Sequence, residues 1–141
     1  MRTSISDAAS APARLRALIE REARREGFDA IGITAPDAIP LAGGRMQRFV
    51  AEGMHGSMGW MAETLARRAS PTVLWPQARS IVMLAMNYGP ERDPREGLEK
   101  RDRALISAYA RNRDYHDVVK GRLKTVAGKL AAASGAEVVV L

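Results

Sequence analysis

The chain has 141 residues, with 22 lysines and arginines against 16 aspartates and glutamates, and no cysteine. Its length suits one domain with a hydrophobic core. The lack of cysteine excludes disulfides, thiolate zinc sites and cysteine-ligated iron-sulfur clusters within the chain. No apolar run reaches the roughly 20 residues of a membrane span, and the start MRTSISDAAS lacks a signal-peptide core. A cytoplasmic protein without a membrane partner is expected.

The first half of the chain has helical hydrophobic spacing on either side of one short apolar run. Ser10 is the expected N-cap of the first helix, and Gly27 its expected stop. The predicted elements, in chain order, are a helix over 11–27, a strand over 28–33, a helix ending near Gly53, a helix over 57–68, and a loop or extended segment between Pro71 and Pro76.

The second half contains the best candidate for a core strand. Residues 80–86, SIVMLAM, are almost all apolar, which predicts a strand covered on both faces. Residues 89–104 are rich in Gly, Pro and charge, which predicts a mobile surface loop. A long helix is expected from a cap at Asp114 to Ser134, followed by a strand over 137–141. Alternating helices and apolar strands predict an α/β fold with helices packed around a small mixed sheet.

The last predicted strand, EVVVL, coincides with the end of the sequence. A chain rarely ends on a buried apolar run without a following turn or tail. We therefore expect a sheet that is incomplete at the C-terminus and a chain that is the N-terminal part of a longer protein. The alternative is a C-terminal strand that closes the sheet.

Most of the net charge of +6 lies in residues 100–124, where eight basic side chains face three acidic ones. Such a stretch suits a polyanion such as RNA, because Lys and Arg displace the counterions of phosphates. The alternative is a solvated helix face. The basic side chains of this stretch are Lys100, Arg101, Arg103, Arg111, Arg113, Lys120, Arg122 and Lys124.

The segment ISAYARNRDYHD, residues 106–117, concentrates hydroxyls, aromatic rings and cations just before the long helix. Free amides at a helix N-terminus and these side chains suit an anionic or amide-rich ligand. The alternative, compatible with the first, is a capping box in which Asp114 is the cap and Asp117 the third helical residue.

Other candidate positions give weaker signals. His55 and His116 lie far apart in sequence and lack the spacing of a helical metal motif, so no metal site is assigned. His55 lies between Gly53 and Gly56, which favours either a tight turn or close approach of a ligand. A structural interpretation of Arg68 is that it interacts with the dipole at a helix C-terminus.

Four segments in series carry a family resemblance: GFDAIGIT, GMHGSMGWM, RRASPTVLWPQARSIVMLAMNY and ISAYARNRDYHDVVKGRLK. In this order and at these intervals they resemble the N-terminal region of the epoxyqueuosine reductases. The resemblance implies an oxidoreductase of queuosine biosynthesis that depends on cobalamin and two 4Fe-4S clusters. The implied reaction is a two-electron reduction that removes the epoxide oxygen of epoxyqueuosine in tRNA.

The resemblance also implies particular site residues. Arg68, in RASP, and Ser107, in ISAYA, correspond to cobalamin contacts. Four further residues belong to the family's YxxGxDYH-like segment and are expected to shape the same pocket: Tyr109, Asp114, Tyr115 and His116. Asn112 stands where glycine is common in the family, and Asn tolerates left-handed backbone better than most residues.

The family's remaining features are not found in these 141 residues. The resemblance implies a proton-donor aspartate after the strand that matches EVVVL and eight cluster-binding cysteines in a ferredoxin-like domain. We therefore expect residues 1–141 to form a monomeric N-terminal domain that contacts cobalamin and tRNA but is inactive alone. The electron donor is left open. The alternatives are a non-catalytic tRNA-binding domain and a fragment of a cobalamin enzyme related to the reductive dehalogenases.

Overall fold

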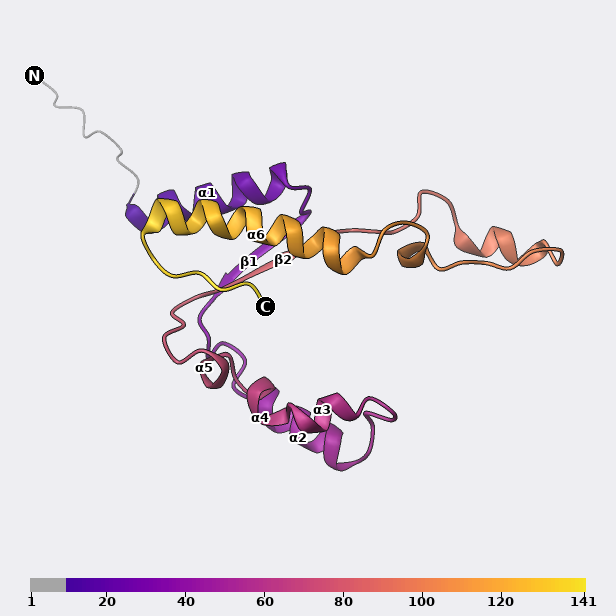
Figure 1. Ribbon diagram of the computed structural model, residues 1–141, viewed down its shortest axis with the longest axis horizontal. Helices are drawn as coiled ribbons and strands as arrows, with labels where there is room; N and C mark the ends of the chain where they lie inside the picture. The colour runs from indigo at the N-terminus through magenta and orange to yellow at the C-terminus, as the bar shows by residue number, and fades with distance from the viewer. Residues whose placement is uncertain (1–9) are drawn as a thin grey trace, which may run out of the picture. The chain divides into compact units, whose positions relative to one another are not determined.

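The computed structural model describes residues 10–141 (Figure 1). The expectation that the N-terminus lacks a signal-peptide core concerns residues 1–10, nine of which lie outside this range. The chain divides into two compact units, one formed by the residues up to 31 and from 84 onward, the other by residues 32–83. Each unit is described by itself below.

The first unit is built on two helices, α1 (Ala11–Arg25) and α6 (Tyr115–Ser134), which lie side by side (Figure 1). The Ser10 hydroxyl accepts a hydrogen bond from the backbone amide of Ala13, as expected of an N-cap. Gly135, which follows α6, ends this helix with a left-handed backbone, at φ of 68°. Both helices and their caps were predicted from the sequence and are confirmed.

A small cluster of buried side chains joins these helices. Ala23 of α1, Val126 of α6 and Phe28, which follows α1, are the members with the least exposure. Ile19 of α1 is the other buried apolar side chain of the described residues. Partly buried side chains surround the cluster: Ile31, Leu84, Met86, Val119 and Leu123. The side of α6 that carries Val119, Leu123 and Val126 therefore faces α1.

One arginine of the basic stretch belongs to this packing. The Nη1 of Arg122 donates to the backbone oxygen of Glu26, 2.9 Å away, and lies 3.6 Å from the sulfur of Met86. Its side chain is partly buried. Arg122 therefore bonds within the chain instead of presenting a free charge.

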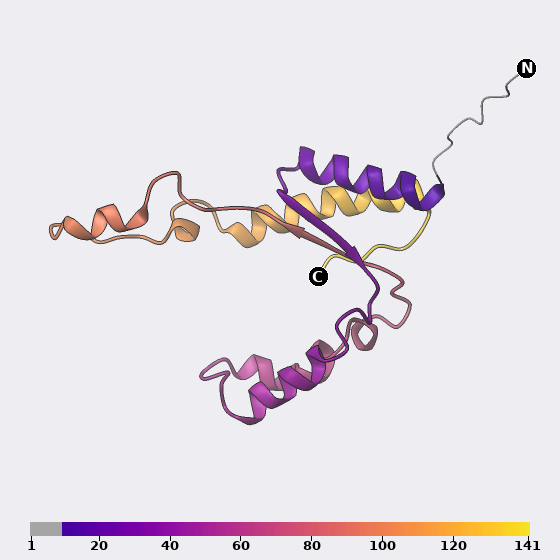
Figure 2. The same cartoon turned by 180° about the vertical axis from the view of Figure 1, so that it is seen from behind.

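Two strands, β1 (Ala30–Thr34) and β2 (Ile81–Ala85), form an antiparallel pair that both views show side by side (Figure 2). The amide of Asp29, just before β1, donates to the oxygen of Ala85 at 2.8 Å. The α/β class and both strands are confirmed. Two details differ from the prediction: the sheet of the described residues is antiparallel instead of mixed, and β2 is not covered on both faces, since Met83 is 63% exposed.

The strand predicted over residues 137–141 is absent from the described structure, where this segment is irregular. Val139 and Leu141 leave much of their side chains exposed. A β-rich sequence forms a strand only when its backbone groups pair with a neighbouring strand. No such partner is present among residues 10–141.

The second unit contains four short helices: α2 (Ala42–Ala51), α3 (Gly59–Glu63), α4 (Leu65–Arg68) and α5 (Pro71–Leu74). The single helix predicted over 57–68 is interrupted at Thr64, whose hydroxyl bonds back to the oxygen of Trp60. Such back-bonding competes with regular helix geometry. The loop or extended segment predicted between Pro71 and Pro76 is instead helical over its first four residues, because Ser70 caps a helical turn in which Pro71 takes the first position.

The polar segment 89–104 contains a 3-10 helix, η1 (Pro94–Glu99), and a second one, η2 (Ala108–Ala110), follows it. Asp93 caps η1 through the amide of Arg95, and the Arg95 guanidinium beside it lowers the pKa of the Asp93 carboxyl. This part of the predicted surface loop therefore contains a short helix with a local polar cap. Within residues 10–141, no helix has the length and apolar character to cross a membrane.

Candidate functional site

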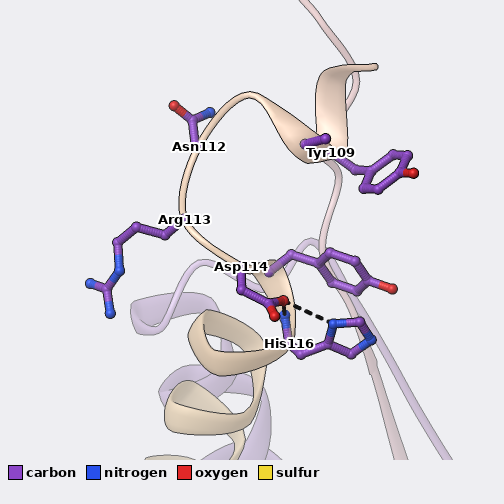
Figure 3. A pocket seen from close by; sticks show the side chains of 7 residues that line it. Tyr109, Asn112, Arg113, Asp114 and His116 are labelled. Atoms are coloured by element: carbon purple, nitrogen blue, oxygen red, sulfur yellow. Dashed lines mark hydrogen bonds and ion pairs between the residues drawn. The ribbon is translucent and has the colours of Figure 1, made fainter. Parts of the chain in front are cut away.

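A shallow hollow of about 330 Å³ lies where η2 leads into α6 (Figure 3). It belongs entirely to the first unit, because seven neighbouring residues of the chain form it. The lining residues are Tyr109, Ala110, Asn112, Arg113, Asp114, Tyr115 and His116. The site is thus built by one tight turn of backbone and the first turn of α6.

Asp114 organises this turn through a single carboxylate oxygen. Its Oδ1 accepts from the backbone amide of His116 at 2.8 Å and from the ring Nδ1 of His116 at 2.9 Å (Figure 3). These bonds with His116 lower the pKa of the Asp114 carboxyl. Because an ionised carboxylate only accepts hydrogen bonds, Nδ1 of His116 carries the proton and Nε2 is left for another partner.

Aromatic contacts fix the rings around the hollow. The rings of Tyr115 and His116 stack with centroids 4.0 Å apart and planes inclined by 28°. Tyr109 meets Tyr115 edge to face, at 6.2 Å and 87°. Such pairs favour defined ring orientations. The turn therefore presents two phenol hydroxyls and an imidazole in a fixed relation.

The hollow is open to solvent. Tyr109 is 55% exposed and Tyr115 is 48% exposed. Asn112 and Arg113 also line the hollow, but their side chains extend to the other side of the turn from Tyr109 and His116 (Figure 3). Phenol hydroxyls and an imidazole on one open surface suit a ligand with several carbonyl or anionic groups, which would lie against the turn and not be enclosed by it.

The hollow includes most of the residues singled out from the sequence. Tyr109, Asp114, Tyr115 and His116 line it together. Ser107 does not; it is exposed and precedes η2, where its backbone oxygen accepts from the amide of Ala110. The capping interpretation is half right: Asp114 caps α6, but among the described contacts Asp117 makes no reciprocal side-chain bond.

Three further lining residues, Ala110, Asn112 and Arg113, were not chosen individually from the sequence, although the segment that contains them was singled out as a candidate site. Their position between Tyr109 and Asp114 was the available signal, because a tight turn brings its connecting residues to the same surface.

Arg68 belongs to the second unit and ends α4. Its Nε donates to the Thr64 hydroxyl at 2.9 Å, and its Cζ lies 4.6 Å from the centroid of the Trp60 ring. The placement at a helix C-terminus is confirmed. Thr64 and Trp60 were missed, although their spacing of four and eight residues before Arg68 places all three on one helix face.

The comparisons with known proteins identify the family. The family model described as epoxyqueuosine reductase QueG, DUF1730, matches residues 68–140, more than half of the chain. The chain belongs to this family. The matched range begins at Arg68 and includes every residue of the hollow, so the candidate site lies within the part of the chain that defines an epoxyqueuosine reductase QueG domain.

Curated relatives extend the match toward the N-terminus. The epoxyqueuosine reductase of Alicycliphilus denitrificans is 38% identical over 124 residues, covering 83% of this chain and 34% of the relative. That of Xanthomonas campestris is 33% identical over 131 residues, covering 92% and 36%. The chain thus spans about a third of the length of these relatives. No solved structure matches it significantly.

His55 lies outside the matched family range, in the turn between α2 and α3. Gly53 and Gly56 beside it take positive φ values of 70° and 54°, so the prediction of a tight turn is confirmed. The ring Nδ1 of His55 is buried without a hydrogen-bond partner. In residues 10–141, no group of three or more His, Cys, Asp or Glu side chains is arranged to hold a metal ion.

The basic stretch is less uniform than its charge suggests. Arg103 pairs with Asp102, whose pKa it lowers, and Nε of Arg111 donates to the backbone oxygen of Ile106. Lys120 and Lys124, in contrast, are exposed on α6 and make no ion pair within residues 10–141. Lys100, Arg101 and Arg113 are likewise exposed and make no ion pair within the described residues, so five side chains of the stretch are available to an external anion.

Proposed function

We propose that this chain is the N-terminal, cobalamin- and tRNA-contacting part of an epoxyqueuosine reductase, an oxidoreductase that reduces epoxyqueuosine to queuosine in tRNA. The observation that carries the proposal is the family match over residues 68–140, which contains both Arg68 and the whole lining of the hollow. The curated relatives carry the name epoxyqueuosine reductase, which supports a reduction of epoxyqueuosine.

The chemistry of the hollow fits a contact with cobalamin. The amide-rich edge of that cofactor offers carbonyl acceptors and amide donors, which match the hydroxyls of Tyr109 and Tyr115 and the unpaired Nε2 of His116. The hollow has the volume of a site for a small ligand, so it would hold an edge of cobalamin and not enclose it. Arg68 and Ser107 are the other proposed contacts.

When bound, cobalamin would supply the redox chemistry that protein side chains lack. The residues of this chain would bind and orient it. Asp114 holds the ring of His116 through Nδ1, which leaves Nε2 available for a contact with the cofactor. This role requires no proton transfer by His116.

Iron-sulfur clusters do not fit the residues of this chain. Such clusters are held by cysteine thiolates, and the sequence contains no cysteine. We therefore propose that the 4Fe-4S clusters of the intact family are bound outside these residues and that this chain does not catalyse the reaction alone. No catalytic residue is assigned to the chain.

The tRNA contact is supported by the exposed lysines of α6. Lys120 and Lys124 lie one helical turn apart, in the helix whose N-terminus forms the hollow. A polyanion bound along α6 would therefore reach the turn that carries Tyr115 and His116. We further propose that the chain is cytoplasmic, where its tRNA substrate is found, and monomeric.

Equilibrium dialysis with hydroxocobalamin tests the proposal, using the folded chain and the absorbance of the cofactor as the readout. We expect retention by the wild-type chain and affinity lowered about 10-fold or more by Arg68→Ala, because charge-assisted hydrogen bonds are the strong ones. Arg67→Ala is the matched control, since it removes the neighbouring exposed cation of the same helix. A folded wild-type chain that retains no cobalamin would contradict the proposal.

The same measurement separates the alternatives. A non-catalytic tRNA-binding domain would bind tRNA in a salt-dependent way and leave cobalamin free. A relative of the reductive dehalogenases would bind cobalamin without measurable affinity for tRNA. The proposed function requires both.

A further inference from the structure

Three side chains of the second unit form a continuous chain of contacts along one helix face. Thr64 donates its hydroxyl to the backbone oxygen of Trp60, at 2.6 Å, and the same hydroxyl accepts from Nε of Arg68, at 2.9 Å. The guanidinium of Arg68 then lies over the indole of Trp60, with Cζ 4.6 Å from the ring centroid. Each of the three residues thus contacts the other two.

This arrangement fixes a side chain that would otherwise move freely. Arg68 is exposed, and a free arginine loses considerable rotamer entropy when a ligand binds it. Here Nε is held by a hydroxyl that is itself anchored to backbone, and the guanidinium plane is held by an aromatic face. Hydrogen bonds in series also strengthen one another.

The contacts leave the ligand-binding edge of Arg68 free. A guanidinium has five N–H donors, and Nε uses one of them for Thr64. Within residues 10–141, the terminal nitrogens of Arg68 make no hydrogen bond or ion pair. The planar fork that suits carbonyl and oxyanion groups is therefore available in a fixed orientation.

We propose that Thr64 and Trp60 are positioning residues that prepare Arg68 to bind cobalamin. This inference rests on the proposed function, in which Arg68 is a cobalamin contact. Thr64 holds the guanidinium through Nε, and Trp60 holds its plane. Neither residue touches the cofactor through the contact described here; both act by reducing the ordering that Arg68 must undergo on binding.

The first test needs no ligand. In a 1H–15N NMR spectrum, the Nε–H signal of Arg68, assigned by its loss in Arg68→Lys, is expected to be resolved and slow to exchange in the wild-type chain. Thr64→Val keeps the shape of the side chain and removes the hydroxyl, so this signal should exchange faster. Thr64→Ser should restore the wild-type behaviour. An unchanged Arg68 signal in Thr64→Val would overturn the inference.

The second test measures affinity for hydroxocobalamin by equilibrium dialysis. Thr64→Val should weaken binding about 2- to 10-fold, the range of one modest hydrogen bond, and Thr64→Ser should recover it. Trp60→Leu should weaken binding in the same direction, and Trp60→Phe less, because it keeps an aromatic face. Thr125→Val is the matched control: its hydroxyl also bonds back to the oxygen four residues earlier, that of Gly121, but contacts no arginine.

The outcomes distinguish the two proposals. One outcome is that Arg68→Ala abolishes cobalamin binding while Thr64→Val leaves it unchanged. This result would overturn the positioning role and support the proposed function. A wild-type chain that binds no cobalamin would contradict the proposed function and, with it, the ligand assigned to Arg68. In that event the NMR comparison still decides whether Thr64 fixes the guanidinium.

Discussion

Arg122 and Glu26 lie 96 positions apart in the sequence and are joined by a hydrogen bond of 2.9 Å from a guanidinium nitrogen to a backbone oxygen. The bond connects the first half of α6 to the residue that follows α1. A cation that the sequence alone assigns to a basic stretch is thus part of the scaffold that presents the hollow.

Arg122→Ala should destabilise the first unit by about 1.5–3 kcal/mol, the usual range for a hydrogen bond to a charged group. Urea denaturation followed by circular dichroism measures the change. Lys124→Ala, on an exposed position of the same helix, should stay within about 0.5 kcal/mol of wild type. Equal stability of the two variants would show that the Arg122 bond contributes nothing.

Gly27→Ala should also destabilise the first unit, by about 1–2 kcal/mol. Gly27 has φ of 83°, and a Cβ there would lie 2.8 Å from Nη1 of Arg122. Gly128→Ala is the contrasting control, since no atom lies within 4 Å of a Cβ at that helical position. It should stabilise the chain by up to about 1 kcal/mol. Thermal unfolding measures both changes: we expect Gly27→Ala to lower the thermal midpoint and Gly128→Ala to raise it.

The helix cap at Asp114 should give stability a specific pH dependence. The pKa of Asp114 is lowered in the folded state, so its bonds to His116 stabilise the chain at pH values above about 3.9, the pKa of an aspartate in the unfolded chain. That contribution is lost as the pH falls through the lower, folded value. The difference in thermal midpoint between wild type and Asp114→Asn should therefore shrink below about pH 4. A difference that stays constant down to pH 2 would exclude this account.

Phe28→Ala should remove most of the stability of the first unit. Phe28 is 2% exposed and packs within a very small buried cluster, so the cost should be about 3–5 kcal/mol. Hydrogen exchange of the α1 and α6 amides is the readout, and loss of protection in both helices is expected. Met83→Ala in β2, where the side chain is largely exposed, should leave that protection unchanged.

Removal of Lys120 and Lys124 should reduce the salt dependence of tRNA binding. If each lysine neutralises one phosphate, each Lys→Ala change should make the plot of log binding constant against log salt concentration less steep by about 0.9. The change should be somewhat smaller at single-stranded regions. The double Lys→Arg variant keeps both charges and should keep the slope. An unchanged slope in the double alanine variant would place the tRNA contact elsewhere.

Local signals in the sequence predicted the long elements well. Ser10 and Asp114 are short polar residues before apolar helical repeats, and Gly135 follows the last repeat, so α1 and α6 were predicted with their caps. Elements that depend on competition between local bonds were predicted less well. The apolar spacing predicted one continuous helix, but the helix is interrupted at Thr64, whose hydroxyl bonds to a backbone oxygen. Between Pro71 and Pro76, Ser70 caps a helical turn that the prolines did not indicate.

Predictions that depend on distant partners were the least reliable. The apolar sequence of 137–141 is typical of a strand, but strand formation requires a paired neighbour. At the site, Asp114 and His116 are close together in the sequence. The sequence could not show that one carboxylate oxygen of Asp114 accepts two hydrogen bonds from His116, because this depends on a side-chain rotamer. The exclusion of Ser107 from the hollow likewise depends on the backbone path through η2.

The caps at the two ends of α6 also constrain how this helix changes in evolution. Asp114 fixes where its first turn begins and Gly135 where its last turn ends, while Val126 between them must face α1. One inserted or deleted residue would rotate the following part by about 100°, since a turn contains 3.6 residues. Exposed positions of α6 can therefore vary in identity, whereas the number of residues between the N-cap and the core contact cannot.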